Sequence, residues 1–269
     1  GSEFLTNPPP SSGGLLIGFA LKLLERLMTG GIRIDTTEGI SRLAEVMHAA
    51  NEARLDSIAR EQLDEQLLDP ELLRDYLDRV SGRTRAFRGT THISVIDRKG
   101  NLASLTTSNG EGCGHMLAAT GIMLNNMLGE EDLNPHGFHA WQENRRLTSM
   151  MAPSVLRFEN GHAIALGSGG SNRIRSAILQ VLLRLVDEQM PLPEAVDRPR
   201  IHYEKGLLNI EHGFDREVYR QLQDEFEQTR CWPDRNMFFG GVHAVSRHRG
   251  TFEHCGDRRR GGVAFNVSG

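Results

Sequence analysis

Cysteine, basic charge and long apolar runs are all scarce in this sequence, and each shortage excludes a class of function. The cysteines Cys113, Cys231 and Cys255 are few, and their spacing fits neither a disulfide framework nor a metal site. A formal net charge of −4 without a polybasic run argues against a nucleic-acid partner. Gly18 and Lys22 interrupt the most apolar stretch, so no run of about 18 apolar residues predicts a membrane span.

Histidine is plentiful, but its spacing is not that of a metal site. The chain has 11 histidines and no HExxH motif, so we expect no metal and no cofactor. Cys113 lies in a Glu-Gly-Cys-Gly stretch, and no histidine and acid at fixed positions single it out as a nucleophile. We therefore interpret Cys113 as a small loop residue.

What remains is the composition of an ordinary globular protein, with 38% hydrophobic and 25% charged residues among 269. Residues 1–4, Gly-Ser-Glu-Phe, read like a cloning scar, and we leave them out of the predicted fold. Leucines at helical spacing predict helices over 15–28, 37–59 and 70–80. Glycine and arginine then predict an exposed loop over 81–89.

At Thr90 the hydrophobic period changes from helical to alternating, which predicts a β-hairpin from Thr90 to Leu105 with a turn at 98–101. Further strands are predicted at 121–125, 154–158, 163–166, 206–211, 242–247 and 262–267, and further helices at 172–189, 192–197 and 216–229. This mixture without a strict βαβ repeat is typical of an α+β fold.

A threonine that begins a strand after a flexible loop carries a specific chemistry. If the chain is cut between Gly89 and Thr90, the new α-amino group, which titrates at about 7.7 to 8.0 in model peptides, lies within reach of the Thr90 hydroxyl. One residue then supplies nucleophile and base. Two adjacent threonines at a strand start are equally ordinary β-formers, so this motif alone is weak.

Two other segments carry possible site chemistry. Gly167-Ser168-Gly169-Gly170-Ser171 lies between a strand and a helix, where backbone N–H groups can receive an anion. The same stretch also fits a simple strand-to-helix turn. Thr148 and Ser149 form a hydroxyl pair ahead of a strand, which also fits an ordinary polar turn.

Taken together and in order, these elements resemble the gamma-glutamyltranspeptidases, a branch of the N-terminal nucleophile hydrolases. The blocks that carry the likeness are 7–14, 90–97, 121–126, 146–153, 167–173 and 199–202. The resemblance implies an α+β, four-layer α-β-β-α sandwich that is N-terminally truncated here. Residues 5–89 correspond to the helical end of the large subunit with its processing loop, and 90–269 to the catalytic small subunit.

The resemblance also assigns catalytic roles. Thr90 aligns with the catalytic threonine, and Gly89–Thr90 with the self-cleavage site. Ser108 stands where the family has a threonine that supports the nucleophile. The oxyanion-hole pair aligns best with Gly170 and Ser171, and a shift of one residue selects Gly169 and Gly170 instead.

Substrate-binding roles follow in the same way. Thr148 and Ser149 represent the serine pair that holds the γ-glutamyl α-carboxylate, and Glu130 aligns with the acid that holds the α-amino group. Asn109 sits one place from the family's asparagine, and Met127 replaces a glutamine. The family's substrate arginine, from its N-terminal half, has no counterpart in this chain.

The resemblance predicts a self-processing threonine amidohydrolase or acyltransferase that acts on small γ-glutamyl amides such as glutathione. Its implied partner is the missing N-terminal large-subunit region. One alternative is a catalytically silent scaffold, and another is the same chemistry on a different acyl amide, such as a β-lactam side chain or poly-γ-glutamate. The family implies a periplasmic or secreted location, and the sequence itself leaves a cytoplasmic one open.

Overall fold

The structure is a computed structural model that describes residues 1–27, 33–59, 68–69, 90–130, 133–134 and 137–267. In chain order its elements are β1 (Ser2–Thr6), α1 (Ser12–Leu27), α2 (Thr37–Ala59), β2 (Thr90–Ile96), β3 (Leu102–Ser108), η2 (Met127–Gly129), β4 (Ser154–Phe158), β5 (Ala163–Gly169), α4 (Arg173–Val186), α5 (Leu192–Asp197), β6 (Ile201–Glu204), β7 (Leu207–Ile210), α6 (Arg216–Glu225), β8 (Thr229–Cys231), η4 (Met237–Phe239), β9 (Gly241–His248), β10 (Thr251–Cys255) and η5 (Arg258–Arg260). The predicted helix at 70–80 and the loop at 81–89 lie outside the described residues.

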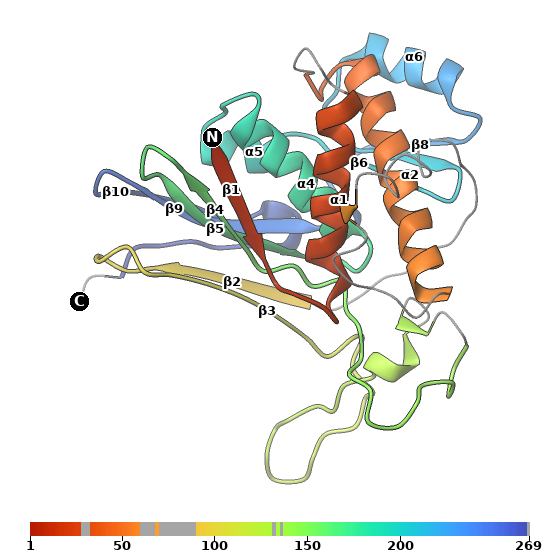
Figure 1. The fold of residues 1–269 in the computed structure, drawn as a ribbon, viewed down its shortest axis with the longest axis vertical. Coiled ribbons are helices and arrows are strands. Elements are labelled where there is room, and N and C mark those ends of the chain that lie inside the picture. The colour runs from red at the N-terminus through yellow and green to blue at the C-terminus, as the bar shows by residue number, and fades with distance from the viewer. Residues whose placement is uncertain (28–32, 60–67, 70–89, 131–132, 135–136, 268–269) are drawn as a thin grey trace.

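A five-stranded antiparallel sheet in the order β1-β4-β5-β9-β10 forms the centre of the molecule (Figure 1). Its first strand corrects a prediction, because Ser2 pairs with Phe158 and Thr6 with Ser154. The residues that we left out of the fold therefore begin its edge strand. Backbone pairing depends little on side-chain identity, so a short polar stretch forms a strand where a partner strand is available.

The hairpin β2–β3 stacks on one face of this sheet, and helix α4 packs on the other (Figure 1). Ser104 ties the hairpin to the sheet: its hydroxyl donates to the Leu166 carbonyl at 3.0 Å and accepts from the Ser154 N–H at 3.0 Å. Ile93, Val95 and Leu105, on the outer face of the hairpin, are 49%, 53% and 57% exposed. Among the described residues, no helix packs on this outer face.

Helix α4 lies between two hydrophobic cores. Ile178 and Leu182 face the central sheet, whereas Leu179 and Leu183 pack with α1 and α2 and with the small sheet β6-β7-β8. Burying one such side chain stabilises the fold by about 1.5 to 3 kcal/mol. The core that contains α1 and α2 therefore joins residues before Thr90 to residues far after it. None of the helices in the described parts of the chain is long and apolar enough to cross a membrane.

Most strands and helices predicted after Thr90 are present, but their ends differ. Helix α6 ends at Glu225, not at 229, because Thr229 already belongs to strand β8. Strands β6, β8 and β10 were missed, since all three are short and carry polar residues.

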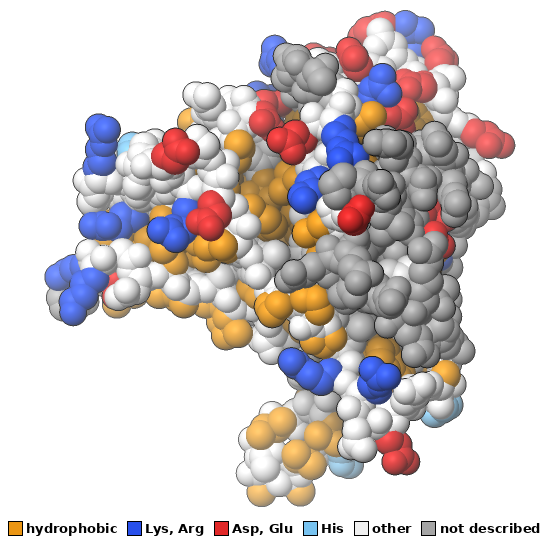
Figure 2. All heavy atoms as spheres, viewed as in Figure 1, with side chains coloured by type: hydrophobic (Ala, Val, Ile, Leu, Met, Phe, Trp, Pro, Cys, Tyr) orange, Lys and Arg blue, Asp and Glu red, His pale blue; other side chains and the backbone are white. Residues whose placement is uncertain are grey.

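Two predicted strands are wrong. Residues 121–125 lie in a narrow ribbon held by an isolated bridge between Met116 and Met123, and residues 262–267 pair with no strand that the structure describes. The ribbon projects from the body (Figure 1), and many of its side chains are hydrophobic (Figure 2). The two arms of the ribbon are joined by single backbone hydrogen bonds, such as that from the Leu124 N–H to the His115 carbonyl at 3.0 Å, and not by a continuous ladder of paired residues. An apolar alternating pattern alone does not create such a ladder.

A buried ionic network also escaped the sequence analysis. Arg200 donates to Asp257 at 2.7 Å, and Arg259 donates to Glu211 at 2.6 and 2.8 Å and to Asp257 at 3.3 Å. Burial lowers the pKa of Arg200 to about 10, and the Asp257 carboxylate opposes that shift. The network fixes the turn after β10 to the strand pair β6–β7. Its partners are far apart in the sequence, so no local pattern indicated it.

Candidate active site

Thr90 is the first residue of β2 and lies directly opposite Ser108, the last residue of β3. Their hydroxyl oxygens are 3.1 Å apart, and the Ser108 hydroxyl also accepts from the Gly110 N–H at 3.1 Å. The hairpin register therefore produces the predicted contact between these two hydroxyls. Gly89 lies outside the described residues.

The glycine turn lies against the same strand end. A side chain at Gly169 would place its Cβ 2.4 Å from the Thr90 carbonyl oxygen, so only glycine permits this approach. Gly170 and Ser171 both have positive φ values, of 131° and 55°. Ser171 is buried, and a left-handed conformation of a buried serine costs of order 1 to 3 kcal/mol. The fold holds this turn in a strained shape next to Thr90.

One small cleft brings together five of the predicted site residues. Thr90, Ser108, Glu130, Ser149 and Ser171 line it. Met127, Leu133, Met150, Met151 and Ile174 complete the lining. The cleft thus places three serine hydroxyls and a buried carboxylate around the candidate nucleophile.

Two predicted substrate residues are not brought into this cleft. The Asn109 side chain is exposed and donates to the Met123 carbonyl at 3.4 Å, and Thr148 is half-buried outside the cleft lining. Asn126 holds the loop after β3 instead, because its side-chain oxygen accepts from the N–H groups of Glu111 and Gly112 at 2.7 and 3.1 Å. Asn126 lies in the block 121–126, but the sequence analysis assigned it no role.

The N-terminal segment packs behind the cleft wall and holds two of its residues, a contact that the sequence analysis missed. The Ser11 hydroxyl lies 3.1 Å from the Ser149 hydroxyl, and the Ser12 N–H donates to the Ser149 carbonyl at 2.9 Å. A Cβ at Gly13 would lie 2.1 Å from the Met150 carbonyl oxygen. In the sequence analysis, residues 7–14 were only one of the blocks that carry the family likeness. Their partner Ser149 lies nearly 140 residues further along the chain, so no local pattern indicated this contact.

The imidazole next to the candidate nucleophile is held neutral. Burial lowers the pKa of His92 to about 4, with a smaller contribution from nearby His243. Its ring nitrogens lie 2.7 Å from the Thr106 hydroxyl and 2.8 Å from the Ser94 hydroxyl, inside the hairpin–sheet interface. His92 therefore packs the hairpin onto the sheet and does not face the cleft. No group of histidine, cysteine and acidic side chains in the described part of the chain is arranged to hold a metal ion.

Comparison with known proteins identifies the family of this chain. A family model for gamma-glutamyltranspeptidase matches residues 1–267. The chain belongs to the gamma-glutamyltranspeptidase family. Its α+β architecture is accordingly that of an N-terminal nucleophile hydrolase.

Two curated relatives and one solved structure give the scale of the likeness. The glutathione hydrolase proenzyme of Bacillus subtilis strain 168 is 28% identical over 305 residues, with 100% of this chain and 51% of the relative covered. The acylase ACY 1 proenzyme of Pseudomonas sp. strain SE83 is 31% identical over 288 residues, with the same coverage. The chain thus spans about half the length of the curated relatives it matches.

The solved structure is the transpeptidase enzyme CapD of Bacillus anthracis. It aligns with a TM-score of 0.54 and 28% identity, covering 66% of this chain and 99% of the CapD chain. Almost the whole of the solved CapD chain therefore corresponds to about two thirds of this sequence.

Proposed function

We propose that this chain cleaves its own Gly89–Thr90 bond, and that the freed Thr90 is the nucleophile of an amidohydrolase or acyltransferase for γ-glutamyl amides. The observation that carries the proposal is the cleft in which the Thr90 and Ser108 hydroxyls, 3.1 Å apart, lie beside the Glu130 carboxylate and the Ser149 hydroxyl. The strained glycine turn closes the same cleft through Ser171.

The chemistry requires one residue to act twice. The Thr90 hydroxyl attacks the amide carbonyl while the Thr90 α-amino group takes its proton, and that proton passes to the departing amine. The product is an ester on Thr90, which water or an acceptor amine cleaves to restore the hydroxyl. Ser108 orients the attacking oxygen, and the backbone N–H groups of the Gly170–Ser171 turn face the developing oxyanion.

Substrate binding rests on two groups in the cleft. Glu130 is 7% exposed, and a carboxylate so placed pairs with the ammonium group of a γ-glutamyl substrate. Ser149 offers a hydroxyl to the α-carboxylate, and the Ser11 hydroxyl holds it at 3.1 Å. Thr148 and Asn109 would join only after a shift of their loops.

Two observations support processing at Thr90. Both curated relatives are named as proenzymes, and residues 90–269 form about two thirds of the chain, which is the share that the CapD chain matches. In addition, α1 and α2 share a core with α4 and β6–β7, so the parts before and after Thr90 would stay together after the cut. We therefore assign the two products to residues 1–89, which contain the region 5–89, and to residues 90–269.

The rest of the protein would cover the hairpin. The relatives are about twice as long as this chain, and the outer face of β2–β3 exposes Ile93, Val95 and Leu105. An apolar face of this kind is typical of a surface covered by further polypeptide. The large-subunit region of a complete protein is the partner that we assign to it.

The decisive experiment compares Thr90→Ala with Thr91→Ala by intact mass and N-terminal sequencing after long incubation. The unprocessed chain has a mass of 30.0 kDa, and we expect a fragment beginning Thr-Thr-His-Ile in the native chain. Thr91 is exposed on the outer face of the hairpin, so Thr91→Ala should process normally, whereas Thr90→Ala should stay whole and fail to hydrolyse a γ-glutamyl anilide. Cleavage of the Thr90→Ala chain at the same bond would refute the proposal.

A second candidate keeps the chemistry and changes the acyl group. The acylase ACY 1 proenzyme is 31% identical to this chain. Met127 lines the cleft, and a methionine side chain there favours a less polar acyl group than a glutamine side chain would. A panel of γ-glutamyl anilide, a β-lactam side-chain amide and poly-γ-glutamate separates these substrates. A chain that neither processes nor turns over any of them, also when supplied with a large-subunit region, would be the silent scaffold.

A further inference from the structure

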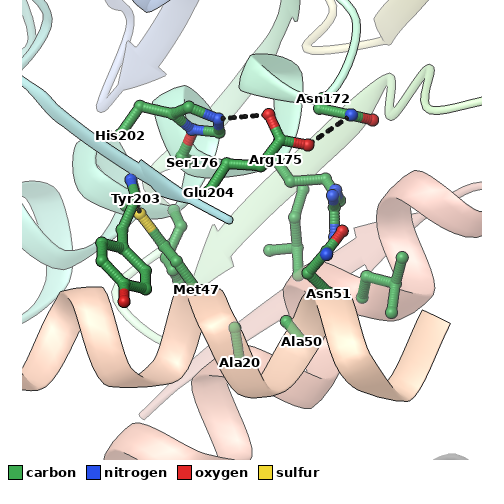
Figure 3. Close-up of a pocket in the computed structure, with 13 residues that line it drawn as sticks. Ala20, Met47, Ala50, Asn51, Asn172, Arg175, Ser176, His202, Tyr203 and Glu204 are labelled. Atoms are coloured by element: carbon green, nitrogen blue, oxygen red, sulfur yellow. Dashed lines mark hydrogen bonds and ion pairs between the residues drawn. The ribbon is translucent and has the colours of Figure 1, made fainter. Parts of the chain in front are cut away.

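A buried polar cluster connects strand β6 to the start of helix α4 (Figure 3). His202 and Glu204 lie two residues apart on β6, so their side chains extend from the same face of the strand. Ser176 comes from the first turn of α4, and Asn172 precedes that helix. The cluster borders a pocket between α1, α2 and α4 and takes no part in the cleft at Thr90.

Hydrogen bonds join these four residues in sequence. Asn172 Nδ2 donates to Glu204 Oε1 at 2.8 Å, the other Glu204 oxygen lies 3.3 Å from His202 Nε2, and His202 Nδ1 lies 2.8 Å from the Ser176 hydroxyl. Asn172, Ser176 and His202 are 4–5% exposed. Burial lowers the pKa of His202, so the ring is neutral at pH 7. A ring that carries its proton on Nε2 donates to Glu204 and accepts from Ser176.

The cluster contains serine, histidine and glutamate, yet its geometry is not that of a hydrolytic triad. Ser176 is 5% exposed, so its hydroxyl does not face a substrate cleft. Its oxygen also lies 3.2 Å from the Arg173 carbonyl oxygen within the first turn of α4, so this carbonyl and the His202 ring compete for the one hydroxyl proton. The arrangement therefore holds structure in place and does not expose a nucleophile.

The end of this chain of bonds is the glycine turn. Asn172 directly follows Ser171 and stands at the N-cap of α4, but its side chain makes no capping hydrogen bond. An asparagine at an N-cap ordinarily accepts from the backbone of its own helix. Here its amide group is used to bind Glu204, so strand β6 fixes the residue next to the strained Gly170–Ser171 backbone.

We propose that Glu204 is a positioning residue, which holds the Gly170–Ser171 turn in place through Asn172 and is itself oriented by His202 and Ser176. This inference rests on the proposed function, in which the Gly170–Ser171 turn binds the oxyanion of the reaction. It also gives a role to the block 199–202, which the site at Thr90 does not explain.

The first test measures the turn without any catalysis. Amide hydrogen exchange over residues 168–173 is compared in the native chain, Glu204→Ala and Glu204→Gln. We expect faster exchange in Glu204→Ala and near-native exchange in Glu204→Gln, because the glutamine carbonyl still accepts from Asn172 while His202 reverses its tautomer. Glu217→Ala, which removes an exposed carboxylate on α6, is the matched control and should change nothing in the turn. Native exchange in a folded Glu204→Ala chain would overturn the inference.

The second test measures catalysis. Losing an oxyanion donor costs about 10² to 10³ in rate, and a displaced donor costs less, so we expect about a 10-fold fall in kcat for Glu204→Ala with KM unchanged. Asn172→Ala should have a similar effect, and the double variant should be no slower than either single variant. Additive losses, or a change in KM alone, would contradict the inference. If even the native chain is inactive, the proposed function fails, and the exchange experiment still decides whether Glu204 holds the turn.

Discussion

The two faces of the β2–β3 hairpin reverse the usual distribution of polar and apolar residues. The inner face, against the central sheet, carries His92, which is 5% exposed. The outer face carries Ile93 and Val95, which are 49% and 53% exposed. Burial in this hairpin therefore follows hydrogen bonding more than hydrophobicity. A polar inner face is stable because each group finds a partner, as His92 does in Thr106 and Ser94.

The same comparison explains why the site is at the end of this hairpin. The polar inner face continues directly into Thr90 and Ser108, so the proposed nucleophile begins a strand that is already fixed to the sheet. The apolar outer face has no such partner among the described residues. One face thus holds the candidate nucleophile in place, and the other is the surface that we propose for further polypeptide.

The largest expected effect comes from crowding the inner face. A Cβ at Gly167 would lie 2.3 Å from His92 Cε1, so Gly167→Ala should push the hairpin off the sheet. Overpacking a tight contact costs about 1 to 3 kcal/mol, and we expect the upper end here, with processing impaired as well. Gly18→Ala, in helix α1 with its nearest neighbour at 3.8 Å, is the control for a glycine substitution that has room. Equal unfolding midpoints in urea for the two variants would contradict the tight contact.

A smaller effect is expected from the protonation of His92. Its pKa of about 4 in the folded chain is below the value of about 6.5 in the unfolded chain, so the unfolded chain binds the extra proton first as the pH falls. Above about pH 6.5 His92 therefore costs the fold no stability. As the pH falls from 7 to 5, it lowers the free energy of unfolding by about 2 kcal/mol.

The measurement is urea unfolding of the native chain and His92→Gln at both pH values. A glutamine keeps two polar contacts to Thr106 and Ser94 and does not titrate. We expect the difference in unfolding free energy between the two chains to change by about 2 kcal/mol over this range. A difference that does not depend on pH would show that His92 is not buried as described.

The smallest effect on the chain itself is expected from the outer face. Ile93→Lys and Leu105→Ser remove half-exposed apolar side chains, so the unfolding free energy should change by no more than about 0.5 kcal/mol. The same variants should weaken association with a separately supplied large-subunit region, measured by calorimetry. Ala103→Ser, on the same face with a small side chain, is the control. A large loss of stability without any partner would mean that the outer face is not open.

Local sequence patterns predicted the elements that carry the site more reliably than they predicted the site itself. The alternating period after Thr90 predicted β2–β3, and the glycines after Leu166 predicted the turn before α4. Ser149 and Glu130 were assigned by family likeness, and the structure places both in the cleft with Thr90. Asn109 was assigned in the same way and lies elsewhere, because the loop after β3 closes on Asn126.

The sequence by itself determined the strand start at Thr90, the glycine turn and the family, because each depends on residues adjacent in the chain. The tertiary structure alone decided the contact of Ser11 with Ser149, the support of Asn172 by Glu204, and the polar packing of His92 under the hairpin. These depend on how sheets and helices stack over long separations. Periodicity shows that a residue faces inward, but only packing determines which distant residue it meets.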